Sequence, residues 1–229
     1  MVEMFESEVV EKKYLTKDVV FLSLTCPEDF SFKAGQYVMF KMDNGEKRKM
    51  KPYSILSPPS QKGRLDFCIK IVEGGFASEM FKTMEIGAKF PVRGPMGHFV
   101  FKEDSEKKKF CFIGTGTGIA PFFSMVQEFV PKMPDKDFQV IFGLRNKAGL
   151  FLHDEFLALA KKYSNFTYLP TLSREKWEGK TGRVQTHLTE DLLEKEFYIC
   201  GLKEMVLDTQ KHLEEQGVSS SHIHFERYS

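Results

Sequence analysis

The chain has 229 residues, enough for one large domain or for two small domains that each bury a core of their own. Lys and Arg together number 33 and Asp and Glu number 32, so the formal net charge of +1 argues against bulk binding to nucleic acid or to an anionic membrane. Hydrophobic residues make up 41% and charged residues 28%, which is the composition of a globular protein and not of a disordered one.

The cysteines limit the metal chemistry that the chain can support. They are far apart in the sequence, at Cys26, Cys68, Cys111 and Cys200. No two form the close pair that zinc and iron–sulfur sites use, so we expect no metal site. The first six residues lack the apolar stretch of a signal peptide, and no apolar run is long enough to cross a bilayer. We therefore expect a cytoplasmic protein with reduced thiols.

The first hundred residues have the pattern of short strands separated by turns. Residues 19–25 are rich in β-branched and aromatic side chains, and residues 37–42 follow a turn at Ala34-Gly35. Between residues 65 and 71, apolar and polar side chains alternate with a period of two. Short strands at this spacing predict a small antiparallel barrel or sandwich.

After a charged stretch at residues 104–109, strands alternate with helices. We expect strands at 110–113, 138–142, 166–169 and 197–200, and helices at about 121–130, 154–162 and 203–216. This alternation predicts a parallel sheet with helices on its faces. The predicted fold is therefore a two-domain α+β protein, with an antiparallel β-barrel in residues 1–104 and an α/β domain in residues 105–229.

A glycine-rich turn joins the first strand of the second half to its first helix. It contains Gly114, Thr115, Gly116, Thr117 and Gly118. Glycines here let the backbone approach a pyrophosphate closely, and the free N–H groups and dipole at the helix start favour an anion. A tight turn without a ligand is the alternative, which the strand–turn–helix context makes weaker.

With this turn, the chain resembles the ferredoxin–NADP reductase family, which includes flavodoxin reductases and the reductase modules of oxygenases. Lys51-Pro52-Tyr53-Ser54 is similar to the family's R-x-Y-[S/T] flavin motif. The resemblance implies that Tyr53 packs on the isoalloxazine, that Ser54 lies near flavin N5 and that the basic residue contacts the pyrophosphate. Lys51 stands where Arg is expected; the loss of the bidentate fork would weaken flavin binding or move the task to Arg48.

Two further motifs of the first half resemble the family. The turn implied to bind the flavin pyrophosphate, with the strand end before it, comprises Lys70, Ile71, Gly75, Phe76, Ala77 and Ser78. Residues 94–99 resemble a G-P-x-G-x-F loop that closes the flavin domain, with a structural role for its glycines.

In the second half, Arg145, Ser173 and Arg174 resemble the edge that surrounds the adenosine ribose. Members that use NADP place a Ser-Arg there, since a phosphate dianion favours an Arg fork and a hydroxyl donor. Arg183 adds charge nearby. We expect NADP(H), with NAD as the alternative because some NAD-dependent members carry a similar Ser-Arg.

The resemblance also implies a hydride-transfer site. Cys200-Gly201 matches the family's C-G motif beside the nicotinamide, and Glu226 would join Ser54 and Cys200 there. Thr117 would contact the nicotinamide side of the dinucleotide, and Tyr228 would cover the flavin face. A small buried thiol and a frayed terminal tyrosine are the simpler interpretations of Cys200 and Tyr228.

These motifs imply a flavoprotein oxidoreductase in which a hydride passes between NAD(P)H and FAD, and electrons pass to or from a separate carrier. Without a cysteine cluster, a ferredoxin or flavodoxin fits best. The basic run at residues 47–51 either steers such an acidic carrier or is a solvated turn. Two other hypotheses remain: a flavin reductase that binds flavin loosely as a substrate, and a noncatalytic electron-transfer or nucleotide-sensing subunit of a larger complex.

Overall fold

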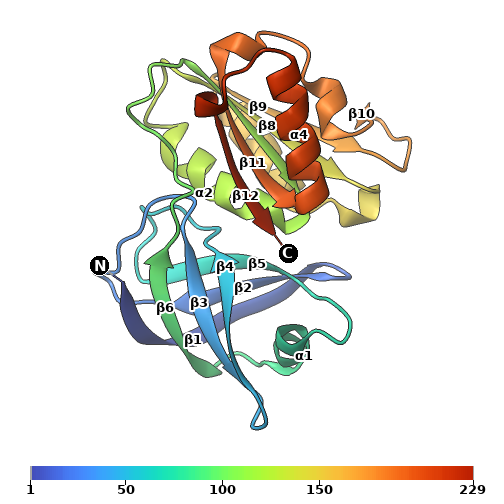
Figure 1. Cartoon of the computed structure of the whole chain (residues 1–229). Coiled ribbons are helices and arrows are strands. Elements are labelled where there is room, and N and C mark those ends of the chain that lie inside the picture. The colour runs from blue at the N-terminus through green and yellow to red at the C-terminus, as the bar shows by residue number, and fades with distance from the viewer. Residues whose placement is uncertain (1, 229) are drawn as a thin grey trace. The chain divides into compact units, whose positions relative to one another are not determined.

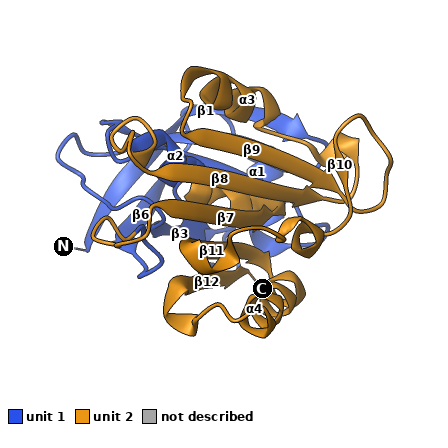
Figure 2. Cartoon of the chain, turned by 90° about the horizontal axis from the view of Figure 1, so that it is seen from above, with its two compact units in different colours: residues 1–101, 123–128 blue, residues 102–122, 129–229 orange. Residues whose placement is uncertain are grey.

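The computed structural model describes residues 2–228 and divides the chain into two compact units (Figure 2). Unit 1 runs to Phe101 and also includes residues 123–128, which belong to a helix of the second half. Unit 2 comprises residues 102–122 and the chain from Phe129 onward.

Unit 1 is built on a six-stranded antiparallel sheet that curls into a half-barrel (Figure 1). Its strands are β1 (Glu3–Thr16), β2 (Val19–Thr25), β3 (Tyr37–Asp43), β4 (Arg48–Ser54), β5 (Arg64–Lys70) and β6 (Lys89–Met96). They lie in the order β4-β3-β6-β1-β2-β5. The predicted strands at 19–25, 37–42 and 65–71 correspond to β2, β3 and β5, and the antiparallel architecture is confirmed.

The long strand β1 holds the two halves of this sheet together. Its first residues pair with β6 and its later residues pair with β2, and the register shifts between Val9 and Glu11 and again between Tyr14 and Thr16. Such irregularities bend a strand and increase its twist. β1 therefore provides the curvature of the sheet, although its sequence shows no clear alternation.

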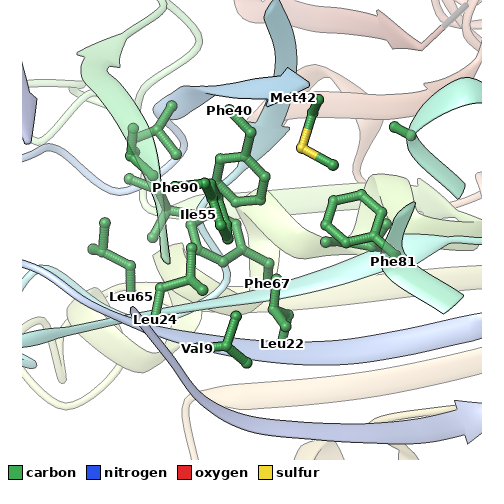
Figure 3. Close-up of a cluster of buried hydrophobic side chains, with 14 of the residues drawn as sticks. Val9, Leu22, Leu24, Phe40, Met42, Ile55, Leu65, Phe67, Phe81 and Phe90 are labelled. Carbon is green, nitrogen blue, oxygen red and sulfur yellow. The ribbon is translucent and has the colours of Figure 1, made fainter. Parts of the chain in front are cut away.

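Aliphatic and aromatic side chains pack together in the core of unit 1 (Figure 3). Phe40 of β3 is fully buried, and its ring centroid lies 4.9 Å from that of Phe67 and 5.1 Å from that of Phe90. The helix α1 (Phe76–Thr83) adds Phe81, 6.2 Å from Phe40. This packing fixes α1 against the inner face of the sheet, where β4 also presents its side chains.

Unit 2 contains a six-stranded parallel sheet in the order β10-β9-β8-β7-β11-β12 (Figure 2). Its strands are β7 (Lys109–Thr115), β8 (Asp137–Leu144), β9 (Phe166–Leu172), β10 (Lys180–Thr181), β11 (Lys195–Leu202) and β12 (Ile223–Tyr228). The helices are α2 (Ala120–Phe129), α3 (His153–Lys162) and α4 (Lys203–Glu215). The parallel sheet with alternating helices is confirmed, whereas β12 is a strand where the sequence suggested only a terminal tail.

No helix within residues 2–228 has the length and apolar character needed to cross a membrane.

Candidate functional site

One face of β4 carries Lys51 and Tyr53, two residues of the first flavin motif. β4 pairs with β3 so that Lys51 lies opposite Phe40 and Tyr53 lies opposite Val38. Because directly opposed residues of an antiparallel pair share a face, and both β3 residues are fully buried, Lys51 and Tyr53 face the inside of the sheet. The Tyr53 ring lies 4.6 Å from Phe40 and 5.4 Å from Phe81. Burial raises the pKa of Tyr53, so its hydroxyl stays protonated and can donate a hydrogen bond.

The other residues of this motif alternate outward or end the strand. Pro52 is exposed on the opposite face, and Ser54 is the half-buried last residue of β4, paired with Tyr37. Arg48 also lies on the outer face, where its Nε is 2.6 Å from Asp43 Oδ2. Arg48 thus lies on the opposite face of β4 from Lys51 and Tyr53 and pairs with Asp43, which favours Lys51 as the basic residue of this motif.

The second flavin motif is a helix start, not the turn that the sequence suggested. Gly75 caps α1, and Phe76, Ala77 and Ser78 form its first turn. The Ser78 hydroxyl is buried and accepts a hydrogen bond from the Val72 amide at 2.9 Å, which closes the preceding loop. The first amides of a helix have no partner within the helix, so this turn offers N–H groups to an anion.

The loop that precedes α1 begins at the end of β5, which is anchored to Asp18. The Lys70 ammonium pairs with Asp18, and the Ile71 amide donates to the Asp18 carbonyl at 2.8 Å. Ile71 packs on the apolar core of unit 1. Lys70 is thus already engaged by a carboxylate, which favours a structural contribution from this strand end.

The last flavin-domain motif also differs from its predicted form. The sequence suggested a loop over residues 94–99, but Gly94, Pro95 and Met96 are the last residues of strand β6. The loop therefore begins at Gly97.

In unit 2, the glycine turn fits closely against the end of β11. A Cβ on Gly118 would lie 2.5 Å from the carbonyl oxygen of Cys200, a distance that no side chain tolerates. Gly116 has φ +54, and a Cβ there would meet no protein atom within 4 Å. One glycine therefore allows the turn to touch β11, and another leaves backbone open to a ligand.

Three parallel strands bring the expected reacting residues to one edge of the sheet. Cys200 of β11 is in register with Gly114 of β7 on one side and with Glu226 of β12 on the other. The carboxyl ends of β7, β11 and β12 therefore align the glycine turn, the thiol and the carboxylate. Ligands of open α/β sheets bind at this edge.

Two side chains at this edge have unsatisfied polar atoms. Within residues 2–228, the buried side-chain oxygens without a hydrogen-bond partner are Ser7 Oγ, Thr115 Oγ1 and Glu226 Oε2. Burial raises the pKa of Glu226 from 4.5 to about 7. Buried polar groups are normally paired, so orphan atoms on Thr115 and Glu226 are suited to a polar ligand.

The remaining predicted residues of this edge lie close by in the chain. Thr117 is half-buried in the short 3-10 turn Gly116–Ile119 that precedes α2. Gly201 and Tyr228 continue β11 and β12 past the aligned residues, and Tyr228 pairs with Leu202. Tyr228 is half-buried and belongs to a paired strand.

A separate part of the same edge carries exposed arginines. Arg145 follows β8 and Arg174 follows β9, and the Arg174 amide donates to the Arg145 carbonyl at 2.9 Å. Ser173 lies between the two strand ends, with its amide and hydroxyl both donating to Leu144 O. Arg183 follows β10 and lies 3.8 Å from Asp208. The structure thus brings Arg145, Ser173 and Arg174 together, with Arg183 one strand further along.

Three aromatic and histidine side chains of unit 2 have local partners. Trp177 donates its indole N–H to the Lys180 carbonyl at 2.6 Å. His187 contacts the Thr171 hydroxyl at 2.8 Å, and His153 lies beside Tyr168. In the part of the chain that the structure describes, no three His, Cys, Asp or Glu side chains are grouped to hold a metal ion.

Together these features fit a flavin and a dinucleotide. Unit 1 offers a buried phenol, an ammonium and a helix start on one inner face, which suits a flavin with a pyrophosphate. Unit 2 offers an open glycine turn and two orphan oxygens on one sheet edge, with arginines on the same edge for a phosphate. This combination defines a flavin-dependent pyridine-nucleotide oxidoreductase.

Comparison with known proteins identifies the family. A family model described as an oxidoreductase FAD-binding domain matches residues 6–101, and one described as an oxidoreductase NAD-binding domain matches residues 112–211. Ferredoxin–NADP reductase B of Sorangium cellulosum is 33% identical over 99% of this chain and 98% of its own length. The chain belongs to the ferredoxin–NADP reductase family and is an oxidoreductase that uses FAD and NAD(P).

Two other relatives show how the chain compares in length and fold. The xylene/toluene monooxygenase electron transfer component XylA of Pseudomonas putida is 29% identical over 96% of this chain but only 64% of its own length. The ferredoxin NADP+ reductase of Neisseria gonorrhoeae, solved with bound FAD and NADP, superposes with a TM-score of 0.88 at 23% identity and 98% coverage of both chains. The second match confirms the two-part fold.

Proposed function

We propose that this protein is an NADPH-dependent flavoprotein reductase that exchanges electrons with a separate small carrier of the ferredoxin or flavodoxin type. In this proposal, residues 1–104 hold FAD and residues 105–229 hold the dinucleotide. The observation that carries it is the alignment of Gly114, Cys200 and Glu226 at the carboxyl edge of β7, β11 and β12.

The residues of this edge orient the nicotinamide. The orphan Oε2 of Glu226 can accept a hydrogen bond from the carboxamide, while the Cys200 thiol borders the ring. With Thr117 and the orphan hydroxyl of Thr115 beside the turn, these groups would fix which ring carbon is presented. Tyr228, at the end of β12, would cover the flavin face.

In unit 1, Tyr53 and Ser54 would hold the flavin ring, and Lys51 with the start of α1, Gly75 to Ser78, would hold its pyrophosphate. Lys70 and Ile71 would support this site from the end of β5, through the ion pair with Asp18 and packing on the core. Pro52 would support it from the outer face of β4. Bound FAD accepts two electrons as a hydride and can release them singly, which is why a one-electron carrier can follow a two-electron donor.

The exposed pair Arg145 and Arg174, with Ser173 between them, supports the preference for NADP(H) over NAD(H), because these groups match a 2′-phosphate in charge and hydrogen bonding. Arg183 would add charge from the next strand. A ferredoxin–NADP reductase among the relatives, together with oxygenase electron-transfer components, supports the choice of carrier class. The cysteines are present as thiols and not as disulfides, which supports a cytoplasmic location.

A second candidate is an NAD(P)H-dependent flavin reductase that releases its flavin. Lys51 in place of arginine favours it, because a single ammonium lacks the fork that holds a pyrophosphate at two points.

The test is anaerobic titration of the purified holoprotein with NADPH and with NADH, followed by addition of ferredoxin or flavodoxin. We expect stoichiometric bleaching of bound flavin, faster with NADPH, and reoxidation by the carrier. Equal and slow bleaching by both nucleotides would contradict the NADP preference. A colourless protein that reduces added flavin would support the second candidate instead.

A further inference from the structure

The basic run at residues 47–51 is divided by strand alternation into two faces. Arg48 and Met50 are exposed on the outer face, where Arg48 pairs with Asp43. Lys49 lies opposite Met42, which is only 1% exposed, and so shares the inner face with Lys51 and Tyr53. Two ammonium groups, and not one, therefore lie on the face that carries the flavin motif.

Ring contacts show that this face of β4 runs alongside α1. At one end, the Tyr53 ring lies 5.4 Å from Phe81, in the second turn of the helix. At the other end, Lys49 Nζ lies 5.3 Å from the centre of the Phe76 ring, in its first turn. Lys51 lies between these two positions on the same face of β4, and the Lys49 ammonium lies over the first turn of the helix.

We infer that Lys49 is a second phosphate-binding residue of the flavin site, acting together with Lys51 in place of a single arginine. Strand geometry separates their Cα atoms by about 7 Å, and two flexible four-carbon side chains can converge from that distance on one pyrophosphate. The free amides of the first turn of α1 lie at the same place. The two lysines would bind the diphosphate group of the ligand, whereas Tyr53 and Ser54 would contact its isoalloxazine ring. This inference rests on the proposal that FAD binds unit 1 at this face.

The alternative is that Lys49 only covers Phe76, as exposed cations over aromatic rings often do. The phosphate-binding role and the covering role of Lys49 predict different dependence on the ligand. A covering role affects the protein with or without flavin, whereas a phosphate-binding role is visible only with a phosphorylated flavin.

The experiment compares the full-length apoprotein and its variants Lys49→Gln, Lys51→Gln and Arg48→Gln. Quenching of flavin fluorescence gives the dissociation constants of FAD and of riboflavin, which lacks phosphate. Arg48→Gln is the matched control, since it removes a neighbouring positive charge from the other face of the same strand.

We expect Lys49→Gln and Lys51→Gln each to weaken FAD binding about tenfold and to leave riboflavin binding unchanged, with Lys49→Arg restoring FAD affinity. Arg48→Gln should leave both ligands within about twofold. The loss should shrink at high salt, because screening weakens the interaction between exposed charges.

Wild-type FAD affinity in Lys49→Gln, with a clear loss in Lys51→Gln, would overturn the inference and leave the proposed function intact. Equal weakening of FAD and riboflavin by Lys49→Gln would also overturn it, since the effect would then come from Phe76 and the protein. Failure of the unaltered protein to bind FAD would instead refute the proposed function itself.

Discussion

Two glutamates at opposite ends of the unit 2 sheet have opposite electrostatic environments. Glu196, near the amino end of β11, is 2% exposed; its carboxylate accepts hydrogen bonds from Ser105 and from His224 Nε2, the latter at 2.6 Å. Burial alone would raise the pKa of Glu196, but the bonds from His224 and Ser105 outweigh it and the pKa is lowered. Glu226, near the carboxyl end of β12, has an orphan oxygen and a pKa raised by burial to about 7.

We interpret this contrast as one between a structural end of the sheet and the end that we propose binds the dinucleotide. At the amino end, Glu196 is satisfied by the protein and ties residues 102–105 to the sheet, with Lys102 Nζ 4.0 Å away. At the carboxyl end, the protein leaves Glu226 unsatisfied in the row that contains Cys200 and the glycine turn. An unpaired buried carboxylate reduces stability, so its presence is best explained by a ligand.

The largest effect that would test the carboxyl end comes from Gly118→Ala. The new Cβ would lie 2.5 Å from the Cys200 carbonyl oxygen, so the turn must move away from β11. We expect NADPH affinity to fall about 100-fold. Isothermal titration with NADPH measures it, and Gly149→Ala is the control, since its Cβ would meet nothing closer than 3.7 Å. Equal affinity in the two variants would show that the turn is not a dinucleotide site.

A somewhat smaller effect is expected from Arg174→Gln, which removes a charge from the exposed arginine pair. Loss of a charge-assisted bond to the 2′-phosphate should weaken NADPH binding about 30-fold while NADH changes less than about twofold. Lys176→Gln, an exposed change in the same loop, serves as control. If the affinities for NADPH and NADH fell by the same factor, this edge would not be the binding site of the 2′-phosphate.

The amino end is tested by Glu196→Gln, which leaves a buried acceptor but removes its charge. Because hydrogen bonds to a charged group are lost, we expect unfolding free energy to fall by about 2 kcal/mol. Thermal melting should show a Tm lower by roughly 4–8 °C. An unchanged Tm would contradict the structural role of this end.

An effect of opposite sign on stability is expected from Glu226→Gln. Between about pH 4.5 and pH 7 the folded protein keeps a proton that the unfolded chain releases, so Glu226 lowers stability increasingly as pH rises. Glutamine avoids this cost. The variant should nearly match the wild type at pH 4 and be more stable by up to about 3 kcal/mol at pH 8, as melting at both pH values would show. A variant less stable at pH 8 would mean that Glu226 has a partner in the protein.

Much of this fold follows from local patterns, and the exceptions have physical causes. The strands β2, β3 and β5 and the alternation of unit 2 are encoded in short periodic segments. β1 was missed because bulges near Val9 and Tyr14 break its period of two, and β12 because its pairing with β11 is a tertiary contact. α1 was missed because it has eight residues and a glycine cap without a side-chain bond.

For the site, motifs predicted the residue types but not their environments. Cys200 and Glu226 were expected to act together, and the register of β11 and β12 makes them neighbours. The burial that raises the pKa of Glu226 depends on packing and is invisible in sequence. The inner-face position of Lys49 follows from strand alternation, because Lys49, Lys51 and Tyr53 are two residues apart along β4.

The most direct test of this contrast is single-turnover reduction of bound flavin by saturating NADPH under anaerobic conditions, in Glu226→Gln and Glu196→Gln side by side. In the proposed site Glu226 orients the nicotinamide, whereas Glu196 supports the sheet, so we expect flavin bleaching to slow about 100-fold in the first variant and to keep the wild-type rate in the second. Wild-type bleaching in Glu226→Gln, or equal slowing in both, would contradict a functional carboxyl end and a structural amino end.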